Sequence, residues 1–232
     1  MYALRVENLT KTYKKINVLD SLSFSIEKNT INCFMGLDEL TNTFLSRILS
    51  LTSKPTSGDI YYFDSLKNHL NNYDNDVSLM PSTLGLSEHL TVYENLVLMA
   101  QLRHIKVKGI KELVVEYMNK YGLSDRLDDK VKTLSPSLKK LVSFVLTIMA
   151  DTKVVILDEP FKDIDIKTRR MLIEYIKELK AIKTFIIFNE IPDTALELAD
   201  NIYFLNNKSL KKVDNITDSK ELEKLLLNAE VR

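Results

Sequence analysis

Val154-Val155-Ile156-Leu157-Asp158-Glu159-Pro160 is the stretch that decides the fold. Its four aliphatic residues, three of them β-branched, predict a strand that is buried on both faces, as the strands of a parallel sheet are. Two adjacent carboxylates follow at the carboxyl end, which is the edge of an open α/β sheet where ligands bind. The pattern therefore predicts charged side chains at a ligand-binding edge. The alternative is a plain core strand followed by a charged turn.

The composition is typical of a globular protein, and 232 residues suffice for one large domain or for a core with a subdomain. The 32 basic and 32 acidic residues cancel, so the net charge provides no attraction to nucleic acid, and no nucleic-acid partner is expected. The single cysteine, Cys33, cannot form an intramolecular disulfide. No apolar run approaches the ~18 residues of a membrane span, and the N-terminus lacks a signal-peptide profile. We therefore expect a cytoplasmic protein.

The chain alternates strand and helix patterns at both ends and is helical in the middle. Short strands are predicted at 4–9 and 17–26, on either side of a polar turn at 11–15. Helical periodicity covers 91–121 and resumes from 138 to 149. This order predicts an α/β fold, in which a parallel-sheet core carries N-terminal antiparallel strands and an inserted helical subdomain. We predict a single domain of residues 1–232, with its core at about 1–82 and 150–215, the helical subdomain at about 83–145 and a C-terminal helix at about 216–232.

Landmarks along nearly the whole chain resemble those of ABC transporter nucleotide-binding subunits. They follow one another in the family's order and spacing: Leu9–Tyr13, Lys54–Ile60, Leu90–Leu96, Asp158-Glu159-Pro160 with Asp165, and Leu198–Ile202. The resemblance implies a P-loop NTPase-like (RecA-like) fold that uses ATP and Mg²⁺ as cofactors. It also implies roles for four residues: Asp158 and Thr43 as magnesium ligands, Glu159 as the residue that polarises the attacking water, and Tyr13 as the residue that stacks on adenine.

The family's phosphate-binding loop, G-x-x-x-x-G-K-[ST], corresponds here to Gly36-Leu37-Asp38-Glu39-Leu40-Thr41-Asn42-Thr43. Thr41 replaces the second glycine, so a Cβ stands where the main chain must approach the phosphates. Asn42 replaces the lysine and removes a positive charge, while Asp38 and Glu39 add carboxylates. One pair of unit charges 4 Å apart interacts by ~4 kcal/mol at an effective dielectric constant near 20. We expect these changes to weaken phosphate binding by roughly several hundredfold or more.

The family's other nucleotide contacts are altered as well. The signature L-S-G-G-Q corresponds to Leu134–Leu138, in which Ser135 is kept and Pro136 has no N–H to offer a phosphate. Ser82 stands where the family has the glutamine of its Q-loop, and Glu190 stands where it has the switch histidine. At neutral pH a carboxylate cannot donate a hydrogen bond to a γ-phosphate and instead repels it.

The first hypothesis is a degenerate cassette subunit to which ATP and Mg²⁺ bind weakly or not at all. It would be a structural or regulatory half of a membrane transporter, held on the inner face of the membrane by a transmembrane permease and paired with a second cassette in a homo- or heterodimer. Its site residues would be vestigial: Glu159 and Glu190 for catalysis, Tyr13, Gly36, Asn42, Thr43, Ser82 and Ser135 for the nucleotide, and Asp158 with Thr43 for any magnesium.

Two alternatives stay open. One is an ATP-hydrolysing transporter subunit with a divergent phosphate loop, in which Lys139 or Lys140 replaces the missing positive charge. The other is a docking module unrelated to transport that keeps the fold as a scaffold. Tight binding of Mg-ATP would favour the first alternative over the degenerate cassette. The identity of the partner tests the second alternative, because a multispanning membrane protein argues for transport and a soluble partner alone argues against it.

Overall fold

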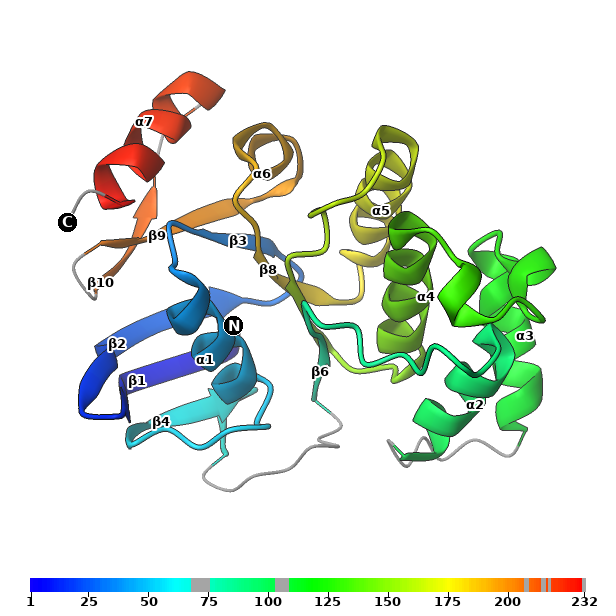
Figure 1. The fold of residues 1–232 in the computed structure, drawn as a ribbon. Coiled ribbons are helices and arrows are strands. Elements are labelled where there is room, and N and C mark those ends of the chain that lie inside the picture. The colour runs from blue at the N-terminus through cyan, green and yellow to red at the C-terminus, as the bar shows by residue number, and fades with distance from the viewer. Residues whose placement is uncertain (68–75, 103–108, 207–208, 214–215, 217, 231–232) are drawn as a thin grey trace.

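The computed structural model describes residues 1–67, 76–102, 109–206, 209–213, 216 and 218–230. Its strands form two sheets (Figure 1). The smaller sheet is antiparallel, in the order β2-β1-β4-β5, and consists of β1 (Tyr2–Tyr13), β2 (Ile16–Glu27), β4 (Ser57–Tyr62) and β5 (Ser65–Leu66). The larger sheet is mostly parallel, in the order β10-β9-β3-β8-β7-β6, and consists of β3 (Ile31–Met35), β6 (Val77–Met80), β7 (Val154–Asp158), β8 (Thr184–Phe188), β9 (Asn201–Asn206) and β10 (Ser209–Val213).

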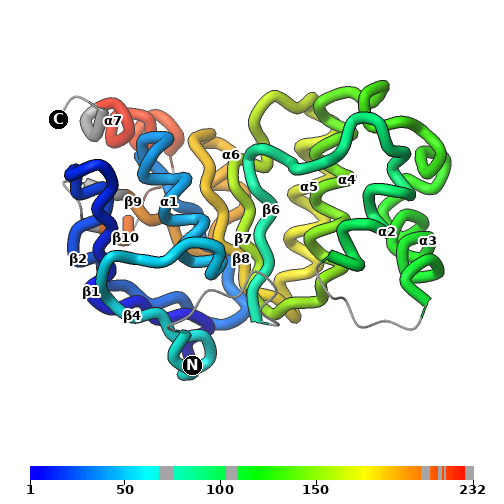
Figure 2. Tube along the Cα trace, turned by 60° about the horizontal axis from the view of Figure 1, so that its bottom comes forward, coloured from blue at the N-terminus to red at the C-terminus, as the bar shows by residue number. Residues whose placement is uncertain are grey.

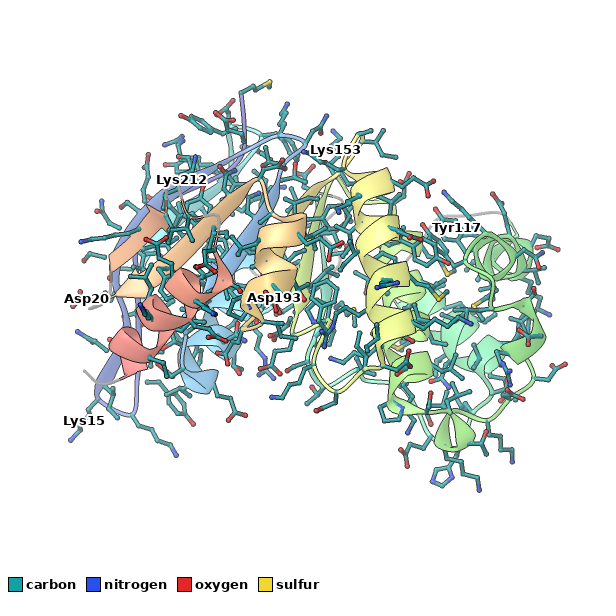
Figure 3. The ribbon with its side chains drawn as sticks, turned by 90° about the horizontal axis from the view of Figure 1, so that it is seen from above. Lys15, Asp20, Tyr117, Lys153, Asp193 and Lys212 are labelled. Atoms are coloured by element: carbon teal, nitrogen blue, oxygen red, sulfur yellow. The ribbon has the colours of Figure 1, made fainter. Side chains whose placement is uncertain are left out.

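The helices cover the larger sheet and extend beyond it. They are α1 (Glu39–Leu49), α2 (Val92–Leu102), α3 (Ile110–Lys120), α4 (Pro136–Met149), α5 (Ile166–Leu179), α6 (Pro192–Leu198) and α7 (Ser219–Glu230), with 3₁₀ turns at Ser124–Arg126 and Val131–Thr133. Helices α2, α3 and α4 contact one another and lie at the opposite end of the molecule from β1, β2 and β4 (Figures 1 and 2). Viewed from above, Lys15 and Asp20 mark one end and Tyr117 of α3 marks the other (Figure 3). The predicted helical insert between two sheet-forming regions is confirmed.

Strand β7 separates two hydrophobic cores. Every residue of β7 is buried, as the aliphatic run predicted. Val154 and Ile156 face a core that is shared with α1 and the antiparallel sheet. Val155 and Leu157 face a second core, which α2 to α6 cover. Because successive side chains of a strand point to opposite faces, an uninterrupted aliphatic run is what a strand between two cores requires.

The only cysteine of the chain, Cys33, lies buried in β3, in the middle of the larger sheet. Burial foremost, and the charge of Asp200 in addition, raise the pKa of its thiol to about 12. The thiol is therefore protonated at neutral pH, and a protonated, buried thiol is a poor nucleophile.

The predicted turn at 11–15 is wrong in extent. Residues 11–13 belong to β1 and pair with β2, so the turn between the strands is reduced to Lys14 and Lys15. Both turn residues have positive φ, 45° and 67°, as the two central residues of a tight hairpin do. Tyr13 is thus the last residue of a strand rather than part of a loop. The sequence pattern also did not indicate the short strands β5, β6 and β10.

Gly58 offers a test of the packing between β1 and β4. A Cβ at Gly58 would lie 2.5 Å from the carbonyl oxygen of Asn8, and Gly58 has a φ of +94°. Gly122 also has a positive φ, +68°, but a Cβ there would meet nothing within 4 Å. We expect Gly122→Ala to lower the unfolding free energy by about 1–2 kcal/mol, the cost of holding a residue with a Cβ in a left-handed conformation. Gly58→Ala should lower it by roughly 1–3 kcal/mol more, because the main chain of β1 must also move away from the new Cβ.

Urea denaturation of both variants measures the difference. Equal losses of unfolding free energy in the two variants would show that β1 and β4 do not approach each other as closely as described.

Candidate functional site

Four of the predicted site residues come at the carboxyl edge of the larger sheet. Strands β3, β8, β7 and β6 are parallel neighbours, so their carboxyl ends lie along one edge. Gly36 directly follows β3 and Asp158 ends β7, while Glu190 comes two residues after β8 and Ser82 two residues after β6. Segments that are more than 100 residues apart in sequence therefore meet at this edge, as the resemblance implied.

The N-terminus of α1 is capped by Asp38. One carboxylate oxygen of Asp38 accepts the N–H of Thr41 at 2.9 Å, and the other accepts the hydroxyl of Thr41 at 2.6 Å. Gly36, with a φ of +71°, makes the turn that leads from β3 into this cap. The first turn of a helix presents unpaired N–H groups and a positive dipole end, which favour an anion. Here the anion is a side chain of the protein itself.

Asp158 is the buried centre of the site, with 4% of its surface exposed. Its Oδ1 accepts a hydrogen bond from Nδ2 of Asn42 at 2.9 Å, and its Oδ2 accepts one from the hydroxyl of Ser46 at 3.2 Å. The main-chain N–H of Ser82 donates to the same carboxylate. Burial is the largest influence and raises the pKa of Asp158, while these three donors counteract it and the charge of Glu159 adds to it.

Asn42 and Ser46 share one face of α1. They are four residues apart, a spacing that places two side chains above each other on a helix. Sequence reasoning missed Ser46, although its distance from Asn42 could have indicated it. The Oδ1 atom of Asn42 is buried and has no hydrogen-bond partner among the described residues. The hydroxyl of Thr43, the predicted magnesium ligand, makes no hydrogen bond within the described part of the structure, and this residue is partly exposed.

The main-chain N–H, the main-chain carbonyl and the side-chain carboxylate of Glu159 all form hydrogen bonds. Its N–H donates to the carbonyl of Phe188 at 3.1 Å, and its carbonyl accepts from Nζ of Lys140 at 2.6 Å. Its carboxylate accepts from Nζ of Lys162 at 3.0 Å. The residue has a φ of +51°, a left-handed conformation that costs a non-glycine residue roughly 1–2 kcal/mol. The carboxylate predicted to polarise water is therefore oriented by an ion pair.

The two lysines proposed as replacement charges both have other partners. Lys139 pairs with the carboxylate of Glu88 at 3.0 Å. Lys140 is 8% exposed and points to the main chain of Glu159. The structure thus contains no contact of either lysine with residues 36–43 among its described hydrogen bonds and ion pairs. The hypothesis of replacement by these residues finds no geometric support.

In the predicted signature segment, Leu134–Leu138, the N-terminus of α4 is also capped by a side chain of the protein. Ser135 is the N-cap of α4 and accepts the N–H of Leu138 at 3.2 Å, and Pro136 occupies the first helical turn. The hydroxyl of Ser137 accepts the N–H of Asp165 at 3.0 Å. Hydrogen bonds from Ser137 foremost, and from Thr168, hold the pKa of Asp165 at about 2.

Tyr13 and Glu190 lie at the periphery of the site. Tyr13 is 41% exposed and rests against Phe44 of α1, with ring centroids 5.1 Å apart and ring planes tilted by 51°. Glu190 is exposed. The preceding residue, Asn189, bonds through its side chain to both the carbonyl and the N–H of Ile191, which fixes this turn.

Neither a metal cluster nor a membrane span was found in the described part of the chain. Its histidines, cysteines and acidic residues form no group of three or more suited to a metal ion. Its helices are all too short or too polar to cross a bilayer.

A family model described as ABC transporter matches residues 19–162. The chain is similar to the spermidine/putrescine import ATP-binding protein PotA of Mycoplasma capricolum, with 25% identity over 212 residues that make up 90% of this chain and 60% of that protein. It is also similar to ATP-binding cassette sub-family A member 9 of Mus musculus, with 27% identity over 216 residues, 90% of this chain and 13% of that protein. The chain thus spans 60% or less of the length of these two relatives.

Solved structures show the same fold. A nucleotide-free ATP-binding cassette from an ABC transporter superposes with a TM-score of 0.81 at 22% identity, covering 98% of this chain and 96% of that one. A dimeric cassette in a post-hydrolysis state, bound to ADP and Pi, superposes with a TM-score of 0.80 at 19% identity, covering 92% of this chain and 100% of that one. The predicted α/β, P-loop NTPase-like fold is confirmed.

Asn42→Leu tests the hydrogen bonding of Asp158. Removing one donor from a buried carboxylate should lower the unfolding free energy by about 1–3 kcal/mol at neutral pH. The difference in unfolding free energy between the wild type and Asn42→Leu should become smaller as the pH falls. The pKa of Asp158 is raised in the folded protein, and loss of Asn42 should raise it further. The folded variant therefore binds a proton at a higher pH than the unfolded chain does. Its unfolding free energy should increase as the pH falls through the interval between these two pKa values.

Urea denaturation at a series of pH values measures both effects. Thr43→Val, one position along α1, is the matched control, since it removes a hydroxyl without a partner in the described structure. A loss for Asn42→Leu that is independent of pH would contradict the assignment to Asp158.

Proposed function

This chain belongs to the ABC transporter family, and on that premise we propose that it is the cassette subunit of a membrane transporter in which binding and hydrolysis of ATP are weak or absent. It acts as a structural or regulatory half of the transporter. Glu159, Glu190, Tyr13, Gly36, Asn42, Thr43, Ser82, Ser135 and Asp158 are, in this proposal, vestiges of a nucleotide site.

The carboxylate of Asp38 at the start of α1 is the observation that carries the proposal. It accepts both hydrogen bonds that Thr41 offers there, which is where a helix N-terminus would otherwise receive a phosphate. A polyphosphate would have to displace this carboxylate and would then lie beside it. Repulsion between two unit charges 4 Å apart is ~1 kcal/mol in water and ~4 kcal/mol at an effective dielectric constant near 20.

The surroundings of Asp158 support the same conclusion. Mg²⁺ requires carboxylate oxygens that can turn toward it, usually together with phosphate oxygens and water. Both oxygens of Asp158 already accept hydrogen bonds, from Asn42 and Ser46. Where the family has a lysine that would neutralise the phosphates, Asn42 supplies a neutral amide. These residues fit a hydrogen-bonded structural cluster better than a magnesium–nucleotide complex, so we derive no catalytic step for this chain.

The proposed partners are a transmembrane permease and a second cassette, either another copy of this chain or a different one. A surface suited to the permease is the shallow, open depression beside α2 and α3, lined by Tyr93, Lys111, Glu112, Val115, Glu116 and Asn119. In this arrangement the chain lies on the cytoplasmic face of the membrane. The proposal includes the predicted organisation of one domain, with its core at about 1–82 and 150–215 and its helical subdomain at about 83–145.

Titration with fluorescent ATP in the presence of Mg²⁺ tests the proposal. We expect no saturation of the wild-type protein up to millimolar ATP. Asp38→Asn with Asn42→Lys keeps a capping oxygen, removes the repulsion and restores the positive charge. This double variant should bind at least about tenfold more tightly, since each charge change is worth about 1 kcal/mol or more.

Glu112→Gln with Asn119→Lys is the matched control, because it changes the net charge equally at exposed positions of α3. It should not alter binding. Micromolar affinity of the wild-type protein, with ATP trapped by Glu159→Gln, would instead establish the alternative of an active ATPase subunit with a divergent loop.

A further inference from the structure

Two hydrogen bonds join helix α4 to the loop that follows β7, residues 159–165. Ser137 and Lys140 lie one turn apart on α4 and are 7% and 8% exposed. Nζ of Lys140 donates to the carbonyl of Glu159 at 2.6 Å, and the hydroxyl of Ser137 accepts the N–H of Asp165 at 3.0 Å. We call these four residues the α4 clasp. Its two contacts hold both ends of loop 159–165 against the same face of one helix.

Lys140 is an unusual residue to find in such a place. Lysine is almost never buried without a specific partner, because its ammonium group loses its hydration. Burial lowers the pKa of Lys140, and the carboxylates of Glu159, Asp158 and Asp163 only partly oppose this. An apolar side chain of similar length would fill the same space without that cost. What it would not supply is the shorter of the two hydrogen bonds to the carbonyl of Glu159; the other comes from the main-chain N–H of Lys162 at 3.4 Å.

That carbonyl belongs to a residue in a left-handed conformation. Glu159 has a φ of +51°, and its N–H is bound to β8 through the carbonyl of Phe188. Its carbonyl accepts a long hydrogen bond from the main-chain N–H of Lys162, at 3.4 Å, and has no partner in the described strand pairings. Lys140 reaches this oxygen from α4, so a strained turn of the core is secured by a residue of the helical part.

We propose that Lys140, together with Ser137, is a positioning residue that makes loop 159–165 and the first half of α4 move as one body. The consequence extends beyond the clasp, since α4 also packs against α2 and α3 (Figure 1). Any displacement of the loop after β7 is thereby passed to the helical end of the molecule within a single chain. This coupling involves no nucleotide, so it does not depend on the function proposed above.

Hydrogen–deuterium exchange of the protein without nucleotide tests the clasp. In Lys140→Met we expect amide exchange to rise about tenfold in two segments at once, 135–142 and 159–166, because loss of one charge-assisted hydrogen bond opens both sides. Ser137→Ala should raise exchange in the same two segments by a smaller factor. Lys140→Gln retains a donor and should restore at least part of the protection.

Lys139→Met is the matched control. Lys139 neighbours Lys140 on α4 but pairs with the exposed carboxylate of Glu88, so its loss should leave segment 159–166 unchanged. The proposal is overturned if Lys140→Met accelerates exchange in α4 alone, or if the two lysine variants behave alike. If Lys140→Met unfolds, the comparison of Lys140→Gln and Ser137→Ala with wild type decides, and unchanged exchange at 159–166 in both rejects the clasp.

Discussion

The burial of one carboxylate governs the arrangement at the carboxyl edge of the larger sheet. Asp158 ends a strand in which every residue is buried, so the protein itself must supply its hydrogen-bond donors. They come from Asn42 and Ser46 of α1 and from the main chain of Ser82 after β6. Three segments distant in sequence are thus joined at one side chain. The carboxylate that the family resemblance predicted as a magnesium ligand thus connects α1, β6 and β7 through hydrogen bonds.

The same N-cap hydrogen bonding occurs at two helices, α1 and α5. At α1 and again at α5, an aspartate accepts both the N–H and the hydroxyl of a threonine three residues later: Asp38 with Thr41, and Asp165 with Thr168. At α5 this is an ordinary helix cap. At α1 the identical cap lies in the segment that the family resemblance predicted as the phosphate-binding loop. The same cap geometry thus occurs at both helices, whatever each helix N-terminus binds.

The fold could be predicted from the sequence because its elements carry period and length signals of their own. The aliphatic run before Asp158 and the helical pattern from 138 to 149 needed no tertiary information. The turn at 11–15 was misjudged because polar residues there also pair across a hairpin. The hydrogen bond of Lys140 could not be read from the sequence, since it depends on a helix meeting a strand end 19 residues away. Ser46 carried one signal, its distance of four residues from Asn42 on the same helix. That position 42 carries an amide where the resemblance predicts a lysine was visible, but the partner of this amide, Asp158, was not.

Cys33 has a practical consequence for anyone who labels this protein. A thiol that is buried and stays protonated far above neutral pH will not react with maleimide dyes while the protein is folded. No native cysteine has to be removed before a fluorophore is attached to a cysteine introduced on the surface. Distances between a dye on α3 and a second one on the antiparallel sheet, at opposite ends of the molecule, could then be followed by energy transfer.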